Sequence, residues 1–106
     1  MSLVEFRVEY TLPVDHPCLP GHFPGAPVVP AVVLLERVEQ ALGAALGAPA
    51  RLRGLPAVKF MSPVLPGVPF AIELAIDPAA RGARFRILAR GQERVQGRVE
   101  YALAPP

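Results

Sequence analysis

The stretch "GHFPGAPVVPAVVLLERVEQALGAALG", residues 21–47, joins a stiff proline-rich segment to the most apolar helical pattern in the chain. At about 100° per residue, seven apolar side chains fall on one half of a helix over residues 31–47. They are Leu34, Leu35, Val38, Ala41, Leu42, Ala45 and Leu46. An apolar face this wide needs a sheet to lie on, so the helix predicts a layered fold.

The ends of this helix carry their own signals. Pro30 can begin the helix, because its ring presets φ and because its missing N–H has no partner in a first turn anyway. Gly47 suits the C-terminal end, and Pro49 follows it. We therefore expect the helix to span residues 31–47.

The sequence on both sides of the helix alternates in hydrophobicity. Residues 4–10, "VEFRVEY", place apolar side chains on one face and charges on the other, as in a half-buried strand. Similar alternation predicts strands at 58–60, 70–76, 83–90 and 99–103. Residues 11–30 form a proline-rich connection, 62–69 and 77–82 form turns, and 92–96 make a short connection.

One strand, one helix and three or four antiparallel strands predict an α+β layer pair. The 106 residues show no internal repeat and no domain boundary, so we expect a single domain over residues 1–106. One helix covers a five-stranded sheet poorly, and edge strands need partners. A dimer formed by edge pairing is therefore expected.

Composition narrows the class of protein. A net charge of +2 is no signature of a nucleic-acid partner. Cys18 is the only cysteine, and neither a CxxC nor a His/Cys cluster predicts a metal. No apolar run reaches the ~20 residues of a membrane span, and the alternating N-terminus is not a signal peptide. We expect a cytoplasmic protein without a membrane partner.

Three features could carry chemistry. His22 lies between prolines and glycines that restrict the backbone, and a side chain held still suits catalysis. Glu36 has the apolar neighbours Val33 and Leu35, so desolvation could raise its pKa toward that of a general acid. The first N–H groups of the helix, around Ala31 and Val32, carry the positive end of the dipole and can hold a carbonyl oxygen.

Each feature also has a plainer interpretation. The histidine can hydrogen-bond its own loop, the glutamate can be an ordinary exposed helix residue, and every helix has an N-terminus. Taken together, a base, an electrophile and an acid suit proton abstraction beside a carbonyl, followed by loss of a β-substituent. His16 is expected to be a loop or surface histidine.

Residues 21–40, "GHFPGAPVVPAVVLLERVEQ", resemble the hotdog-fold 3-hydroxyacyl-acyl-carrier-protein dehydratases of type II fatty-acid synthesis. The lead-in "DHPCLPGHF" and the later "VKFMSPVLPG", residues 58–67, also look similar to this family. The matching motif positions are Gly21, His22, Phe23, Pro24, Pro27, Val28, Pro30, Val32, Glu36 and Gln40.

The resemblance implies a role for individual residues. His22 would remove the C2 proton, and Glu36 would protonate the departing 3-hydroxyl or hold the resulting water. The backbone N–H at Ala31 would bind the thioester carbonyl. Phe23, Val32 and Gln40 are predicted to contact the substrate. The product would be a trans-2-enoyl thioester.

The resemblance also implies the fold and the partners. The fold would be a hotdog, an antiparallel sheet of about five strands wrapped around one long helix. The histidine and the acid of one site would come from opposite subunits, so we expect a homodimer with shared sites, or a higher oligomer. The substrate would arrive on acyl carrier protein with its phosphopantetheine, and no other cofactor is expected. Phe60, Met61 and Phe70 would line an acyl tunnel or simply pack in the core.

Three positions depart from the family pattern. Ala31 replaces a glycine, and Arg37 and Glu39 replace small residues; a charge at Glu39 usually means a partner across an interface. The departures at Ala31 and Arg37 keep one alternative open, a non-catalytic subunit of a heterodimeric dehydratase. A hotdog acyl thioesterase is the other alternative, because the fold would support both chemistries. The C-terminal arginines belong to a solvated sheet face or to a docking patch for an acidic carrier. They are Arg81, Arg84, Arg86, Arg90, Arg94 and Arg98.

Overall fold

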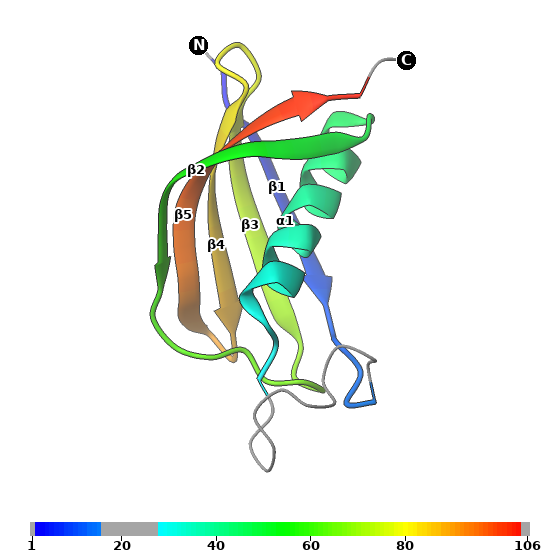
Figure 1. Cartoon of the computed structure of the whole chain (residues 1–106), viewed down its shortest axis with the longest axis vertical. Helices are drawn as coiled ribbons and strands as arrows, with labels where there is room; N and C mark the ends of the chain where they lie inside the picture. Colours follow the sequence, from blue (N-terminus) through cyan, green and yellow to red (C-terminus); the bar gives the residue numbers. More distant parts are fainter. Residues whose placement is uncertain (1, 16–27, 105–106) are drawn as a thin grey trace.

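A computed structural model describes residues 2–15 and 28–104 as a five-stranded antiparallel sheet wrapped around one helix (Figure 1). The order of the strands in the sheet is β1-β3-β4-β5-β2. The elements are β1 (Val4–Tyr10), α1 (Ala31–Leu46), β2 (Ala50–Phe60), β3 (Phe70–Asp77), β4 (Gly82–Ala89) and β5 (Gln92–Leu103). The predicted α+β class and the strand–helix–strands order are confirmed.

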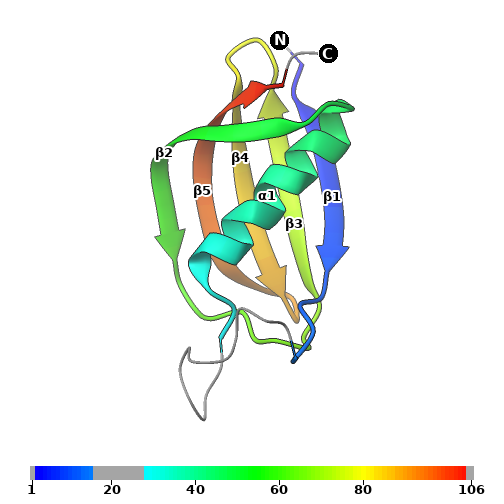
Figure 2. The ribbon, with the colours of Figure 1, turned by 45° about the vertical axis from the view of Figure 1, so that its right-hand side comes forward.

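The sheet curves around α1 because β2 is irregular. Its pairing with β5 shifts register between Leu52 and Gly54 and again between Gly54 and Ala57. In Figures 1 and 2 the first part of β2 crosses the upper end of the helix, and the strand then bends downward. At this bend a Cβ on Gly97 would lie 2.5 Å from the carbonyl oxygen of Ala57, so β5 needs a glycine where β2 passes closest.

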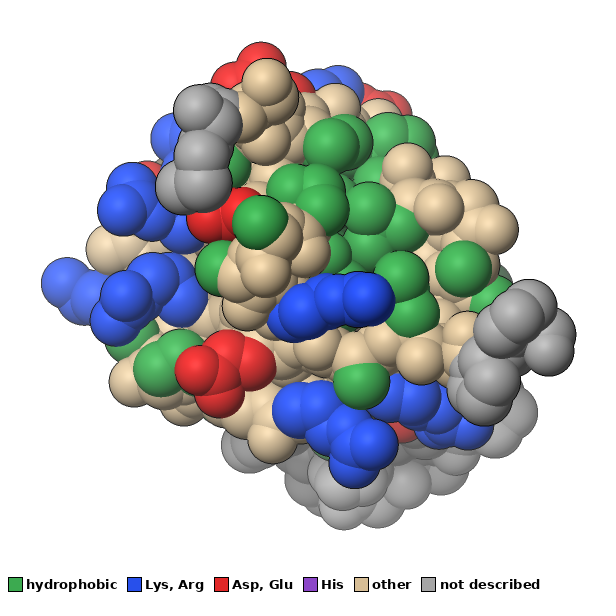
Figure 3. All heavy atoms as spheres, turned by 90° about the horizontal axis from the view of Figure 1, so that it is seen from above, with side chains coloured by type: hydrophobic (Ala, Val, Ile, Leu, Met, Phe, Trp, Pro, Cys, Tyr) green, Lys and Arg blue, Asp and Glu red, His purple; other side chains and the backbone are tan. Residues whose placement is uncertain are grey.

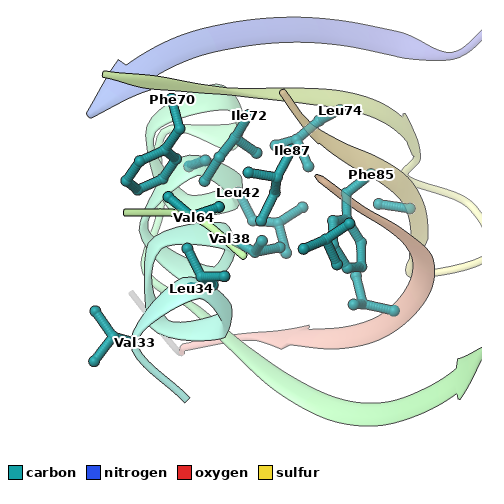
Figure 4. Close-up of a cluster of buried hydrophobic side chains, with 14 of the residues drawn as sticks. Val33, Leu34, Val38, Leu42, Val64, Phe70, Ile72, Leu74, Phe85 and Ile87 are labelled. Atoms are coloured by element: carbon teal, nitrogen blue, oxygen red, sulfur yellow. The ribbon is translucent and has the colours of Figure 1, made fainter. Parts of the chain in front are cut away.

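The core lies between α1 and the inner face of the sheet. Leu34, Val38 and Leu42 point from the helix toward the strands (Figure 4). They meet buried side chains of β3, β4 and β5, which are Phe70, Ile72, Leu74, Ile76, Ala83, Phe85, Ile87, Ala89, Val95, Val99 and Tyr101. Apart from Val95, which falls in the predicted connection 92–96, the alternation predicted for these strands places the same side chains inside.

The helix begins at Ala31, as predicted. Pro30 is extended, with φ −62° and ψ 147°, so it is the N-cap rather than the first helical residue. Its carbonyl accepts hydrogen bonds from the N–H groups of Val33 (3.0 Å) and Leu34 (3.2 Å). The helix ends at Leu46, and Gly47 adopts the left-handed conformation expected of a C-terminal glycine.

Two predicted strand boundaries are wrong. β2 begins at Ala50 rather than residue 58, because its cations, Gly54 and Pro56 obscure the alternation. β5 begins at Gln92, so residues 92–96 are strand rather than a connection. The true connection is Arg90 and Gly91, both with positive φ, which is the geometry of a two-residue hairpin turn. Arg90 therefore belongs to a turn and not to the outer face of β4.

The outer face of the sheet, opposite the helix, carries a groove of about 800 Å³ between two rows of outward side chains. One row contains Arg7, Glu73, Arg86, Gln96 and Lys59, and the other contains Glu5, Ala75, Arg84, Arg98 and Ala57. The hydrogen bond from Arg86 holds the pKa of Glu73 below its ordinary value, and Arg7 adds to this effect. Arg84 lies directly opposite Arg98, a repulsive pairing.

Figure 3 views the end of the molecule that holds the β3–β4 turn, where Lys and Arg side chains collect along one side beside an exposed hydrophobic area. Within residues 2–15 and 28–104, no helix is long and apolar enough to cross a membrane. The cytoplasmic location stays a prediction.

Candidate active site

The N-terminus of α1 forms one wall of the candidate site. In the part of the chain that the structure describes, no side chain caps this end and its first turn holds no acid. The positive end of the helix dipole is therefore not neutralised by a nearby carboxylate among these residues. Ala31, whose backbone N–H is the predicted carbonyl donor, is exposed at this end.

A second wall comes from the connection after β2. Residues 60–64, from Phe60 to Val64, face Val28, Val29, Ala31 and Leu34 across a mostly apolar hollow of about 270 Å³. The N–H of Val29 donates to the carbonyl of Val64 at 2.8 Å, which ties the two walls together just before Pro30. Phe60 and Met61 are 50% and 40% exposed, so they line this hollow rather than fill the core. Phe70 is buried in the core instead.

Val32, Glu36 and Gln40 lie one turn apart on the exposed side of α1. The structure thus places three of the predicted site residues on one exposed helix face, whereas Ala31 and Leu34 are the residues of α1 that line the hollow. Glu36 is exposed, so the chain alone does not supply the desolvation that the sequence prediction assigned to it. A covering surface would have to provide it.

Arg37 and Glu39, the two charged departures, have partners within the chain. The Nη1 of Arg37 donates to Oε1 of Gln40 at 2.9 Å, and its guanidinium lies 5.6 Å from the centre of the Tyr10 ring. Oε2 of Glu39 accepts the N–H of Leu52 at 2.8 Å. Glu39 was expected to have a partner across an interface, but the structure gives it a partner in its own chain, a backbone group of β2 where the register shifts.

The predicted base, His22, and the predicted contact Phe23 lie outside the described residues, as do His16 and Cys18. Among the described residues, no three His, Cys, Asp or Glu side chains lie close enough together to hold a metal ion. The larger groove on the outer face contains none of the predicted site residues. We place the candidate site at the helix N-terminus, where the apolar hollow and the positive end of the helix dipole coincide, with Glu36 further along the exposed face of α1.

Sequence reasoning missed the wall formed by Ser62, Pro63 and Val64 and the residue that holds it, Arg94. The segment was predicted as a turn within the family-like stretch 58–67, with no contact to the helix N-terminus. The nearest signal was its proline-rich pattern "SPVLPG", which indicates a shaped turn but not its neighbours. The contact between Arg94 and Ser62 spans 32 residues of sequence.

A sheet wrapped around one helix, with a hollow at the helix N-terminus, is the architecture of hotdog-fold proteins. A family model described as ApeI-like, ApeI dehydratase, matches residues 3–98. The chain therefore belongs to the ApeI-like dehydratase family.

Two relatives carry the name 3-hydroxyacyl-[acyl-carrier-protein] dehydratase FabZ. The protein of Thermus thermophilus is 32% identical over 109 residues, covering 92% of this chain and 77% of that protein. The protein of Haemophilus influenzae is 34% identical over 77 residues, or 65% of this chain. This chain's match spans only 52% of the Haemophilus protein's length.

Solved structures share the fold. The dehydratase heterocomplex ApeI:P from Xenorhabdus doucetiae matches with a TM-score of 0.82 at 23% identity, covering 92% of this chain and 87% of that chain. A mutant of the fluoroacetyl-CoA-specific thioesterase FlK matches with a TM-score of 0.71 at 18% identity, covering 98% and 87%. At these identities the likeness establishes the fold alone, and the fold hosts more than one chemistry.

Proposed function

We propose that this protein is a dehydratase that removes water from a 3-hydroxyacyl thioester carried on acyl carrier protein, giving the trans-2-enoyl thioester. One observation carries the proposal: Glu36, at the motif spacing from His22, stands on the exposed face of α1 beside the open helix N-terminus. Membership of the ApeI-like family and the names of the FabZ relatives support it.

In the proposed mechanism, the thioester carbonyl lies at the N-terminus of α1 and accepts the N–H of Ala31. The helix dipole then stabilises the negative charge that develops on this oxygen. His22 takes the C2 proton, the C2=C3 double bond forms, and the C3–O bond breaks. Glu36 donates a proton to the departing hydroxyl, so water leaves and the charges balance.

A second subunit would complete this site. β2 is one edge of the sheet, so its outer backbone groups have no partner strand among residues 2–15 and 28–104. Exposed apolar side chains lie on β2 or directly after it, at Leu55, Phe60 and Met61, and Val32 of α1 is 61% exposed. We infer that a homodimer pairs its β2 edges, covers Glu36 and brings His22 of one subunit to Glu36 of the other. The reaction uses no cofactor beyond the phosphopantetheine that the carrier brings.

We place the carrier on the arginines of β4 and β5. Arg84, Arg86 and Arg98 are exposed on the outer face, and the opposed pair Arg84–Arg98 has no ion-pair partner among the described acids. An acidic protein would relieve their repulsion. Replacing Arg84 and Arg98 by glutamate should lower kcat/KM for carrier-bound substrate and leave a small thioester unaffected. Binding that does not weaken with added salt would count against this docking site.

A different assembly is the second candidate. β2, "ARLRGLPAVKF", carries three cations and no acid, so self-pairing would double the positive charge along one edge. This observation favours a related subunit with an acidic edge, in which case each shared site needs only one complete half. Ala31 in place of glycine and the Arg37–Gln40 hydrogen bond fit a subunit that contributes less to catalysis. Activity that appears only after a related subunit is added would support this reading.

The test is a dual assay on the purified full chain. A short 3-hydroxyacyl thioester is supplied, and enoyl absorbance and free thiol are followed together beside His22→Ala and Glu36→Gln. Enoyl product that disappears in both variants supports the dehydratase. Thiol release without enoyl product would replace it with the thioesterase. Absence of both signals, also on carrier-bound substrate, would reject catalysis by the homodimer.

A further inference from the structure

Arg94 occupies an unusual place in the sheet. Ile87 of β4 pairs with Val95 of β5, whereas the next residue, Leu88, pairs with Glu93. Arg94 is therefore the extra residue of a β-bulge, opposite no single residue of β4. A bulge turns a side chain away from the direction that regular pairing would give it.

The bulge directs Arg94 onto the segment that follows β2. Its carbonyl accepts the N–H groups of Met61 (2.8 Å) and Ser62 (3.2 Å). Its Nη1 donates to Oγ of Ser62 (3.2 Å) and lies 3.5 Å from the carbonyl of Pro63. Its Nη2 donates to the carbonyl of Ala89 at 3.3 Å. One residue thus joins the end of β4 to the second wall of the candidate site.

The contacts continue into the site. Ser62, Pro63 and Val64 line the hollow at the helix N-terminus, and Val64 accepts the N–H of Val29, which immediately precedes Pro30. A displacement of the Ser62–Val64 wall would therefore move both the apolar lining and the segment that leads into α1. The position of Ala31 relative to an acyl chain depends on this connection.

An arginine is a costly residue for purely structural use here. Its Nε is buried without a hydrogen-bond partner, and no described acid forms an ion pair with it. The planar guanidinium reaches acceptors on two elements at once, which the single ammonium of a lysine does not reproduce. Burying this unpaired Nε costs stability, and the hydrogen bonds that hold the Ser62–Val64 segment in one position give a reason for that cost.

We propose that Arg94 is a positioning residue of the candidate active site, holding the Ser62–Val64 wall against the helix N-terminus and so setting how the acyl chain is seated. The inference rests on the proposed dehydratase function. It concerns the binding of the acyl chain and not the proton transfers.

The experiment compares Arg94→Lys and Ser62→Ala with Arg90→Lys, a matched control in the exposed turn of the same hairpin. Kinetics are measured with N-acetylcysteamine thioesters of 3-hydroxybutyrate and 3-hydroxyoctanoate. Arg94→Lys should lower kcat/KM for the longer chain by roughly tenfold to a hundredfold, through KM, with a smaller change for the shorter chain. Ser62→Ala should act in the same direction, and Arg90→Lys should match the wild type.

A loss of equal size for both chain lengths, carried by kcat, would overturn the proposal, as would an Arg94→Lys variant that behaves like the wild type. Amide hydrogen exchange separates this inference from the proposed function. Arg94→Lys should speed exchange at Met61, Ser62 and Val29, whereas Arg90→Lys should not. If the wild type turns over neither these thioesters nor carrier-bound substrate, the proposed function fails. Unchanged exchange in Arg94→Lys would independently refute the positioning role.

Discussion

The two faces of α1 have different roles, one in packing the core and the other in presenting candidate site residues. The buried face, with Val33, Leu34, Val38, Ala41 and Leu42, packs on the sheet and has no ionisable group. The exposed face presents Val32, Glu36 and Gln40 outward beside an open helix N-terminus. One helix therefore supplies the core with apolar volume and the site with chemical groups. Substitutions on one face should change stability, and substitutions on the other should change activity.

The largest effect is expected on the exposed face. Glu36→Gln removes the proposed proton donor and should lower kcat for dehydration by about 10²–10⁴-fold. Because the side chain is exposed, the free energy of unfolding should change by no more than about 0.5 kcal/mol. Steady-state kinetics and denaturant unfolding measure the two quantities. Glu9→Gln, an exposed acid of β1, is the control and should keep full activity.

On the buried face, a substitution should lower stability and leave activity almost unchanged. Leu42 is fully buried against the sheet, so Leu42→Ala leaves a cavity and should destabilise the fold by about 2–5 kcal/mol. Below the unfolding midpoint, kcat should stay near that of the wild type. A variant that keeps its stability but loses turnover would contradict the division between the faces.

Glu39 lies between the two faces of α1 and is half-buried, so its substitution tests how much a single hydrogen bond to β2 contributes to stability. Glu39→Ala removes the acceptor of the Leu52 N–H and should cost about 1–3 kcal/mol in unfolding free energy, because a partly buried donor loses its partner. Glu39→Gln keeps an acceptor and should cost less. Equal stability of the two variants in urea titrations would show that the hydrogen bond contributes nothing.

The smallest effect concerns Arg37. Burial raises the pKa of Tyr10 above its ordinary value of 10.0, and the positive charge of Arg37 opposes this rise. Arg37→Gln should therefore raise the pKa of Tyr10 further and cost about 0.5–1 kcal/mol of cation–π attraction. Ultraviolet titration in a Tyr101→Phe background isolates the phenol. A pKa of Tyr10 that falls in the variant would refute this assignment.

The sign of the accompanying pH effect follows from the raised pKa. The folded state holds the Tyr10 proton more tightly than the unfolded state does. The resulting stability is present below the ordinary tyrosine pKa and is lost as the pH rises through the folded-state value. Arg37→Gln should lose stability more steeply than the wild type in this alkaline range.

Much of the fold was predictable because the signals are local. Alternation located β1 and β3 to within a residue, and apolar spacing located α1. The failures occurred where local signals conflict. Gly54, Pro56 and two arginines hide the first half of β2, and the polar start of β5 resembles a loop. Sheet pairing decides these segments, and pairing partners lie far apart in sequence.

The candidate site likewise has features that local sequence predicts and features that depend on contacts between distant residues. Helical periodicity alone places Val32, Glu36 and Gln40 on one face, and the motif links Glu36 to His22. Only the tertiary structure shows which side of the helix stays open. It also shows the hydrogen bond that Glu39 accepts from the Leu52 N–H, and the β-bulge at Arg94. The sequence by itself determined which residues are available for chemistry, because periodicity is a short-range property. Only the tertiary structure decided which of them meet, because long-range strand pairing, with its bulges, sets where each side chain points.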